Sequence, residues 1–187
     1  MATAALVFGA LAACGLAVAT FLMPAPANIY RTSIYDITLP QGWVCRMEGT
    51  ELVCTPPEQP FHAMLIATMK YRNTKTDTLD AYVEHLETPA TLQLPDGETM
   101  KSTVEHVGRR LINGRTWAEA THVNSEVKGY RTHYLGTFTA QVAILITFSV
   151  YVNDVEIYQP AMEDMVRSIN LYQRLDDTPA SLASSRP

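Results

Sequence analysis

The N-terminal thirty residues constrain this chain more than any other part, because they contain no charged side chain; the first is Arg31. Residues 2–23 form one apolar run of 22 residues. At a rise of about 1.5 Å per residue, a helix of that length crosses a hydrocarbon core of about 30 Å. Pro24 and Pro26 would end it, since proline lacks the amide hydrogen and restricts the residue before it. Residues 1–27 are therefore predicted to be a transmembrane anchor or a signal segment.

Three fates of this segment are consistent with its sequence. An uncleaved anchor explains its length, because the apolar part of a secretory signal peptide is usually only about 7–15 residues long. A cleaved signal peptide would use the small residues that end at Ala27. A lipoprotein would carry its lipid on Cys14, which follows Leu11-Ala12-Ala13 in the pattern of a bacterial lipobox. Retention, cleavage after Ala27 and lipidation at Cys14 all stay open.

Two of the three cysteines, Cys45 and Cys54, flank a predicted hairpin whose loop is Gly49-Thr50. Counting outward from that loop places them opposite each other at a non-hydrogen-bonded position, where Cα atoms approach to about 4.5–5.5 Å. A disulfide tolerates that separation. A metal or redox pair is the alternative, but zinc sites favour short spacings and further ligands, whereas eight residues intervene here. We therefore predict a structural disulfide.

A disulfide also indicates a compartment, because such bonds persist outside the reducing cytosol. Together with the apolar N-terminal segment, it predicts a protein of the bacterial inner membrane whose domain faces the periplasm. The formal net charge of −5 and the scatter of the 14 basic residues argue against nucleic acid as a partner. The expected partners are the lipid bilayer, through the N-terminal helix, and a membrane protein complex.

After the N-terminal segment, the spacing of apolar residues predicts an antiparallel sheet and two amphipathic helices. Asn113-Gly114 separates two of the strands and is a strong signal for a two-residue hairpin loop. Other strands are predicted at 35–39, 61–71, 130–138 and 142–152, helices at 78–88 and from Pro160 onward, a loop at 89–100, and a disordered tail at 173–187. At least two strands are apolar on both faces, so the predicted fold is α+β, an antiparallel sheet covered by helices as an α-β-α sandwich.

Five segments, in order, are YDITLPQGW, LDAYVEHLE, VGRRLINGRTWAEATHV, AILITFSVYV and PAMEDMVRSINL. On these segments the chain resembles the PsbP-like superfamily, which includes the DcrB-like bacterial envelope proteins, over about residues 33–172. The resemblance implies an α-β-α sandwich that usually lacks enzymatic activity and serves as an accessory or interaction subunit. It carries over no catalytic residues, because the superfamily has no shared catalytic motif.

Catalytic and metal-binding chemistry has little support in the sequence. The five histidines do not form a metal-binding spacing, and no nucleophile motif or glycine-rich phosphate loop is present. In a regular hairpin at 113–114, His122 faces Glu105, and this pair could bind a metal together with His106 or His133. Polar pairs on the surface of the sheet are the alternative. We expect no enzymatic activity, no cofactor and no metal.

Three side chains form a candidate interaction surface, namely Trp43, Arg110 and Trp117. The hairpin places Arg110 opposite Trp117, where a cation–π contact would form. Core packing is the alternative for both tryptophans. The expected function is that of a non-catalytic, membrane-tethered periplasmic accessory or scaffold subunit of a larger envelope complex. The alternative is an envelope protein that binds a small molecule, a lipid or a metal.

Overall fold

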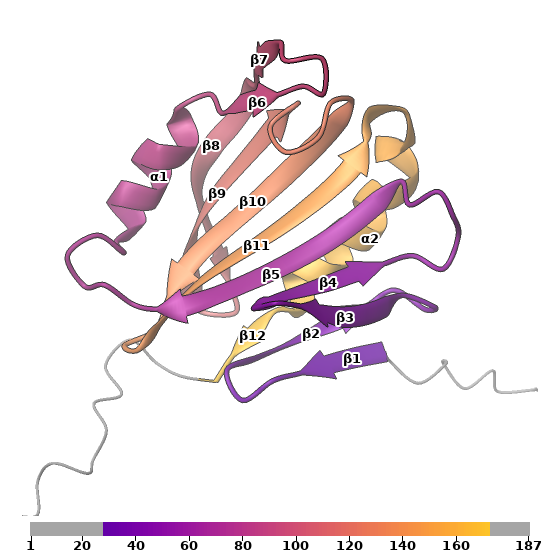
Figure 1. Cartoon of the computed structure of the whole chain (residues 1–187). Helices are drawn as coiled ribbons and strands as arrows, with labels where there is room; N and C mark the ends of the chain where they lie inside the picture. The colour runs from indigo at the N-terminus through magenta and orange to yellow at the C-terminus, as the bar shows by residue number, and fades with distance from the viewer. Residues whose placement is uncertain (1–27, 173–187) are drawn as a thin grey trace, which may run out of the picture.

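The computed structural model describes residues 28–172, and the N-terminal segment and C-terminal tail lie outside the described residues. The described domain is an α+β fold of antiparallel strands with two α-helices (Figure 1). The strands are β1 (Asn28–Arg31), β2 (Tyr35–Leu39), β3 (Val44–Glu48), β4 (Glu51–Thr55), β5 (Ala63–Tyr71), β6 (Thr91–Gln93), β7 (Thr99–Lys101), β8 (Thr103–Ile112), β9 (Arg115–Val123), β10 (Tyr130–Phe138), β11 (Val142–Tyr151) and β12 (Asn170–Leu171). The helices are α1 (Leu79–Glu87) and α2 (Val155–Ser168), the latter preceded by a 3-10 turn (Val152–Asp154).

Seven of the strands form the main sheet in the order β3-β4-β5-β11-β10-β9-β8, so β3 and β8 are its edges. A three-stranded sheet, β1-β2-β12, and the small β6-β7 hairpin complete the described strands. The predicted hairpin between β8 and β9 is confirmed. Asn113 and Gly114 have φ values of 46° and 79°, the left-handed conformation that this two-residue loop requires at both positions.

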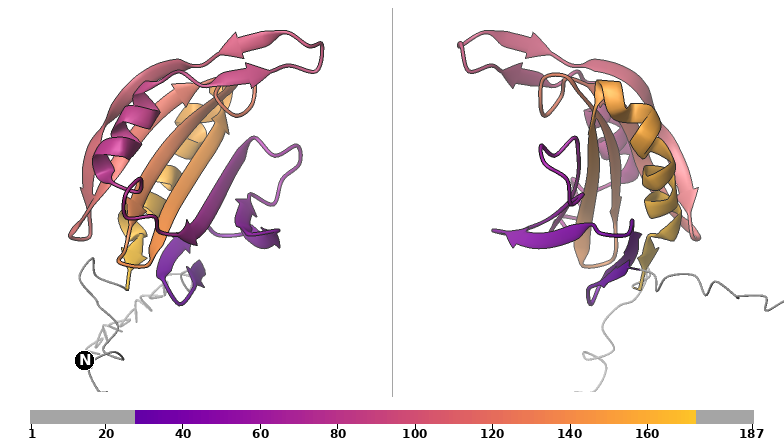
Figure 2. Two further views of the ribbon diagram at one scale, coloured as in Figure 1. Left: turned by 60° about the vertical axis from the view of Figure 1, so that its left-hand side comes forward. Right: turned by 90° about the vertical axis from the view of Figure 1, so that its right-hand side faces the viewer.

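One face of the main sheet carries the larger core. Leu135 on β10, Ile146 on β11 and Ala67 on β5 lie in register across three strands and point to the same side. There they belong to one buried cluster with Met165 of α2 and Ile37 of β2. The helix α2 and the three-stranded sheet therefore cover this face together, as the views in Figure 2 show.

The opposite face of the main sheet is covered only in part. The helix α1 packs on β8, β9 and β10, where Leu86 contacts Ala118, Ala120 and Tyr134 in a smaller buried cluster. In Figure 1, α1 lies beside β8 and β9 on the near side of the sheet, and α2 lies behind it. Among the described residues, no helix lies over β5 and β11 on the near side. The two helices thus cover opposite faces, but α1 leaves half of its face open.

Two predicted segments differ from the observed ones. The helix α2 begins at Val155 and not at Pro160, which lies inside it. The chain passes from β11 through the 3-10 turn into the helix, and the side chain of Asp154 is hydrogen-bonded to the ring of His62 instead of capping the helix. This start therefore lacks the usual capping pattern. Residues 89–100, predicted to be a loop, contain β6 and most of β7, which pair as a hairpin.

The predicted disulfide is confirmed. Cys45 and Cys54 are bonded, and they face each other across β3 and β4 with their Cα atoms 4.1 Å apart. A separation this short is typical of a non-hydrogen-bonded pair. The bond fixes β3, an edge strand, to its only strand partner in the main sheet.

Reduction of this disulfide is expected to lower the free energy of unfolding by about 2–3 kcal/mol, because the bond closes a short loop and restricts the unfolded chain. Urea unfolding of the protein with and without reductant measures the change. The Cys45→Ser/Cys54→Ser variant has no bond to reduce and serves as the control. A reductant effect of the same size in that variant would show that the stabilisation comes from elsewhere.

Candidate functional site

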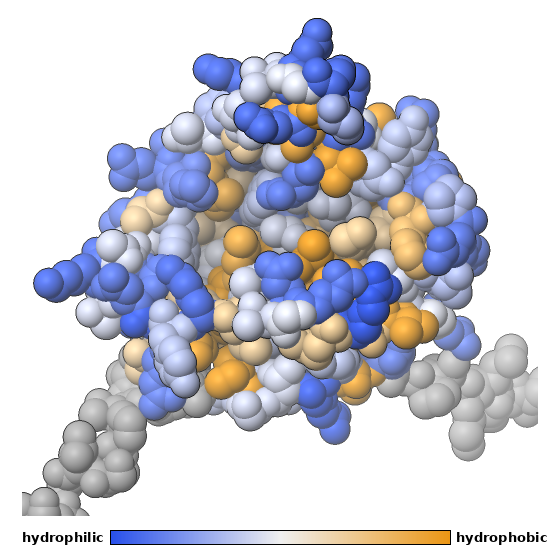
Figure 3. Space-filling view, in the orientation of Figure 1, coloured by the Kyte–Doolittle hydropathy of each residue, from blue (hydrophilic) through white to orange (hydrophobic). Residues whose placement is uncertain are grey.

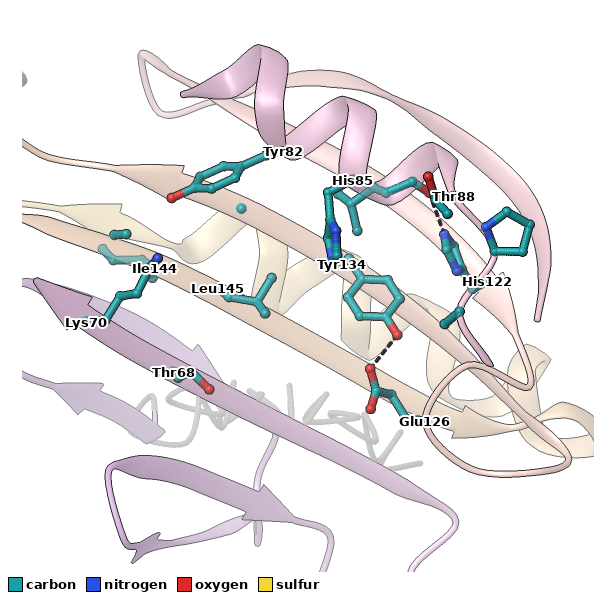
Figure 4. Close-up of a pocket in the computed structure, with 15 residues that line it drawn as sticks. Thr68, Lys70, Tyr82, His85, Thr88, His122, Glu126, Tyr134, Ile144 and Leu145 are labelled. Carbon is teal, nitrogen blue, oxygen red and sulfur yellow. Dashed lines mark hydrogen bonds between the residues drawn. The ribbon is translucent and has the colours of Figure 1, made fainter. Parts of the chain in front are cut away.

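A cleft of about 450 Å³ lies between α1 and the open half of the main sheet. We call it the α1 cleft. Tyr82 and Leu86 of α1 form one wall, and Tyr134 and Gly136 of β10 and Leu145 of β11 form the floor (Figure 4). In Figure 3, hydrophobic residues gather in a hollow of this face with hydrophilic residues around it. The site is thus a surface cleft with an apolar floor.

The shape of the α1 cleft follows from two residues that face each other across β10 and β11. Gly136 pairs with Leu145. A Cβ atom at Gly136 would lie 3.3 Å from the ring of Tyr82, so the glycine allows α1 to approach the sheet closely at this point. Leu145 lies beyond the reach of α1 and remains 40% exposed. The cleft therefore has a closed side under the helix and an open side over β11.

Most polar side chains around the α1 cleft already have partners within the protein. The hydroxyl of Tyr134 donates to Glu126 at 2.6 Å. Toward the other end of the cleft, the ammonium of Lys70 lies 2.9 Å from a carboxylate oxygen of Asp77. Burial, followed by the hydrogen bond to Asp77, raises the pKa of Tyr82, and burial and Glu126 likewise raise the pKa of Tyr134. Both phenols therefore act as hydrogen-bond donors and do not ionise at neutral pH.

His122 is buried at the α1 cleft and holds the helix to the sheet. Its Nε2–H donates to the carbonyl oxygen of Leu86 at 2.8 Å, and its Nδ1 accepts from the hydroxyl of Ser102, with 3.3 Å between the two atoms. Both ring nitrogens are thus engaged inside the protein. His122 is therefore buried with its polar atoms bonded, and it connects the last turn of α1 to β9.

The predicted pairing of His122 with Glu105 is wrong. A bulge between Val104 and His106 shifts the register of β8, so His122 pairs with Val104. Glu105 instead accepts a hydrogen bond from Arg131 at 2.7 Å. Within residues 28–172, no group of three or more histidine, cysteine or acidic side chains is placed to hold a metal ion.

A second cleft, of about 290 Å³, lies on the opposite face beneath α2. At its centre is the carboxylate of Glu119 on β9, whose side chain is 12% exposed. Nη1 of Arg110 is 3.2 Å from this carboxylate, Nε2 of His133 is 3.3 Å away, and Nε2 of His106 is 3.7 Å away. Arg110 also reaches Glu163 of α2, with 2.8 Å between Nη2 and the carboxylate. We call these five residues the Glu119 cluster.

The Glu119 cluster is an ion network that joins three strands to α2. His133 and Arg110 together hold the pKa of Glu119 down at about 2. Arg110 lowers the pKa of Glu163, and the same contact raises the pKa of Arg110. Nε2 of His133 is buried, but its orientation falls short of a hydrogen bond to Glu119. Because each carboxylate here lies beside a basic side chain, the network stabilises the contact between the sheet and α2.

Neither tryptophan of the predicted interaction surface is available to a partner, so that part of the prediction is wrong. Trp117 is 1% exposed and Trp43 is 7% exposed, and Trp43 stacks on Phe148 in the core with ring centroids 5.9 Å apart. Arg110 does pair with Trp117 in the register. Its guanidinium, however, binds the two carboxylates of the Glu119 cluster, because they lie on the same face of the sheet.

The outer side of β3 is a second candidate surface. No described strand pairs with it. Because Cys45 occupies a non-hydrogen-bonded position opposite β4, its backbone N–H and C=O groups point away from β4, and the same holds two residues on at Met47. The side chains of Val44 and Met47 are 65% and 59% exposed. This edge therefore offers both backbone groups and apolar side chains to an added strand.

Apart from His122, a candidate metal ligand, the sequence did not single out the residues of the α1 cleft as a site. Leu145 is an apolar residue within the strand predicted at 142–152, and nothing in the sequence distinguishes it from a residue covered by a helix. Gly136 carried a usable signal, since a glycine inside a strand marks the close approach of another group. That signal indicates where α1 touches the sheet, but not where the helix stops covering it.

The predicted membrane segment cannot be compared with the structure, because the anchor, Ala27 and Cys14 all lie outside the described residues. Within residues 28–172, none of the helices has the length and apolar character needed to cross a membrane.

Comparisons with protein-family models and with curated protein sequences give no match. Solved structures do match. Cyanobacterial PsbP from Synechocystis aligns with a TM-score of 0.56 and 10% identity, over 84% of this chain and 99% of that one. LpqN, described as involved in cell envelope biogenesis of Mycobacterium tuberculosis, aligns with a TM-score of 0.51 and 8% identity, over 73% of this chain and 82% of that one. The Ran-binding protein Mog1p of Saccharomyces cerevisiae aligns more weakly, with a TM-score of 0.48 and 11% identity, over 74% of this chain and 90% of that one. The first two matches agree with the order of elements quoted from the sequence, and the described domain has the PsbP-like fold.

Proposed function

We propose that this protein is a non-catalytic accessory subunit, tethered to the bacterial inner membrane by its N-terminal segment. Its periplasmic domain would bind an extended segment of a partner protein within a larger envelope complex. The observation that carries this proposal is the outer edge of the main sheet at β3, with which no strand of residues 28–172 pairs. LpqN, which shares the fold, is described as involved in cell envelope biogenesis, and this is the setting that we propose here.

The two edges of the main sheet differ in a way that supports strand addition at β3. Proteins usually protect an exposed edge with a bulge or with charged side chains. The edge strand β8 has both, namely the bulge between Val104 and His106 and the exposed guanidinium of Arg109. The strand β3 pairs with β4 without a bulge, its charged residues Arg46 and Glu48 pair with each other, and it exposes Val44 and Met47. It is therefore the edge that is suited to receive a partner.

The disulfide and the side chains of β3 define the partner segment further. Because the bond fixes β3 to β4 in advance, a partner would not have to order this strand on binding, which reduces the entropic cost. Arg46 and Glu48 form an exposed ion pair on one side of the strand, and Met47 projects on the other. A segment with an acidic residue beside Arg46 and an apolar residue beside Met47 fits this edge.

The test uses the full chain, extracted from native membranes in mild detergent, as bait for its partner. The Met47→Lys variant is expected to recover roughly one-tenth of the partner that the unaltered chain recovers, because a lysine on an edge strand opposes strand addition. Quantitative mass spectrometry of the co-purified proteins measures the loss. The Leu111→Lys variant is the matched control, because Leu111 is 71% exposed on the opposite edge strand, β8. It should retain the partner.

Two outcomes would overturn the proposal. One is equal recovery of the partner with Met47→Lys and with the unaltered chain. The other is a chain that is a monodisperse monomer in every mild extract. If the unaltered chain forms an oligomer with itself and the Met47→Lys variant is a monomer, the edge binds a second copy of the chain and the proposed partner is wrong.

A further inference from the structure

We infer that the α1 cleft binds the hydrocarbon chain of an amphiphile with an anionic head group, such as a fatty acid or an acidic lipid. This inference goes beyond the proposed function and concerns a different surface, since β3 does not line the α1 cleft. Four properties of the cleft lead to it: its size and shape, the scarcity of free polar groups on its walls, the saturated backbone of its floor, and the charges at its rim.

The first property is size and shape. A volume of about 450 Å³ falls within the range of about 300–1,000 Å³ that is typical of small-molecule pockets. In Figure 4 the lining residues extend along the sheet, from Lys70 and Tyr82 near one end to Glu126 and His122 toward the other. Leu145 lies between the two ends, on the open floor. An elongated, apolar cleft of this kind suits a chain better than a compact polar molecule.

The second property is that most polar side chains of the walls, apart from His85, are already bonded within the protein. Tyr134 donates to Glu126, and the hydroxyl of Thr68 donates to Glu51 at 3.1 Å. Both ring nitrogens of His122 are engaged. A polar ligand would lose its hydrogen bonds to water on entering the cleft and find few protein groups free to replace them. Each ligand group left unpaired would weaken binding. A hydrocarbon chain has no such requirement.

The third property excludes an extended peptide as the occupant. The floor consists of β10, β11 and β5, which are interior strands with a paired neighbour on each side. Their backbone N–H and C=O groups are used in the sheet, so a peptide laid on them would bury its own backbone groups without partners. Free backbone groups of this kind occur at the β3 edge, where we place the partner segment. The two surfaces therefore suit different classes of ligand.

The fourth property is the placement of charge at the rim. Lys70, His85 and His122 are the basic side chains among those lining the cleft, and Glu126 is the acidic one; His122 is already bonded through both ring nitrogens. In Figure 4 the ring of His85 projects from α1 over the floor, on the side of Tyr134 that is away from Glu126. A carboxylate or phosphate head group would therefore lie at the Lys70 end of the cleft, where the ammonium keeps further N–H donors beside its contact with Asp77, and the chain would run along Leu145 toward His85 and Tyr134.

Photolabelling of the full chain in native membranes tests this inference. The probe is a palmitic acid that carries a photoreactive diazirine in its chain, and the readout is the set of labelled peptides. We expect adducts on the peptides that contain α1 and β11. The Leu145→Trp variant, which fills the cleft, should reduce these adducts roughly tenfold. The Leu111→Trp variant places the same ring on an exposed site elsewhere and should not.

Further arms separate the sources and the alternatives. If unlabelled palmitate reduces labelling by the probe and phosphatidylglycerol vesicles do not, the natural ligand is a free fatty acid. If the vesicles reduce labelling and palmitate does not, the ligand is a membrane lipid. The His85→Gln/Lys70→Gln variant should weaken labelling by the palmitic acid probe but not by the alcohol of the same chain length, which has no charge. The Met47→Lys variant should label normally, so failure of the edge proposal leaves this one testable.

Three results would overturn the inference. The first is label confined to peptides outside α1, β5, β10 and β11. The second is equal labelling in the Leu145→Trp and unaltered chains, with near-ultraviolet circular dichroism showing that both are folded. The third is a photoreactive residue at position 145 that captures a protein instead of a lipid, which would make the cleft a protein-docking site.

Discussion

The Arg110→Met variant is expected to be less stable than the unaltered protein by about 3 kcal/mol in free energy of unfolding. Arg110 lies between two carboxylates, 3.2 Å from Glu119 and 2.8 Å from Glu163, and its side chain is only 26% exposed. The variant loses the arginine partner of both carboxylates and leaves Glu119 with histidines alone; removing one partner of a buried ion pair costs about 3–5 kcal/mol in well-buried cases. The partial exposure of Arg110 places the effect at the lower end. Urea unfolding followed by fluorescence measures it.

The neighbouring arginine provides a matched control. Arg109 is on the same strand, but it pairs with Asp80, whose side chain is 89% exposed. Arg109→Met should therefore change stability by well under 1 kcal/mol, as is usual for surface ion pairs. If the cost of Arg110→Met arises from the uncompensated charge of Glu119, then adding Glu119→Gln to that variant should recover part of the stability. Equal losses in the two arginine variants, or no recovery, would show that methylene packing and not charge is responsible.

The elements that could be predicted from the sequence are those whose signal is local. Asn113-Gly114 placed the β8–β9 hairpin because its two positions must accept positive φ. The first helix was predicted at 78–88 and is observed at Leu79–Glu87, since Thr78 caps it by accepting a hydrogen bond from the backbone N–H of Ala81. The disulfide followed from counting outward along one hairpin. In each case the residues that decide the structure are close together in the chain.

The features that could not be predicted depend on contacts between distant segments. One extra residue at Glu105 forms a bulge and turns His122 to a different partner, and a hydrophobic pattern does not reveal such a bulge. The α1 cleft exists because α1 stops short of β11, and the length of a helix does not determine how it lies on a sheet. The Glu119 cluster is assembled from β8, β9, β10 and α2. Its residues span positions 106–163 and have no common spacing in the sequence.

Acidification is expected to remove about 3 kcal/mol of stability as the pH falls from about 4.5 to about 2, through the titration of Glu119. Its pKa is lowered from 4.5 to about 2 by His133 and then by Arg110. A carboxyl group whose pKa is lower in the folded state than in the unfolded state contributes its full stabilisation above the unfolded value. That contribution is lost as the pH falls through the folded value, and between the two pKa values stability falls by about 1.4 kcal/mol for each pH unit. Urea unfolding at a series of pH values measures the slope.

The Glu119→Gln variant is the control, since it cannot titrate at this position. It should be less stable than the unaltered protein at neutral pH, and its stability should fall less steeply with acid. Some slope will remain, because Arg110 also lowers the pKa of Glu163. The Arg110→Met variant should show an intermediate slope, since Glu119 keeps His133 when it loses the guanidinium. If stability falls equally steeply with acid in all three proteins, acid acts through other carboxylates. That result would also remove the charge-based explanation of the Arg110 effect, because both predictions depend on Glu119.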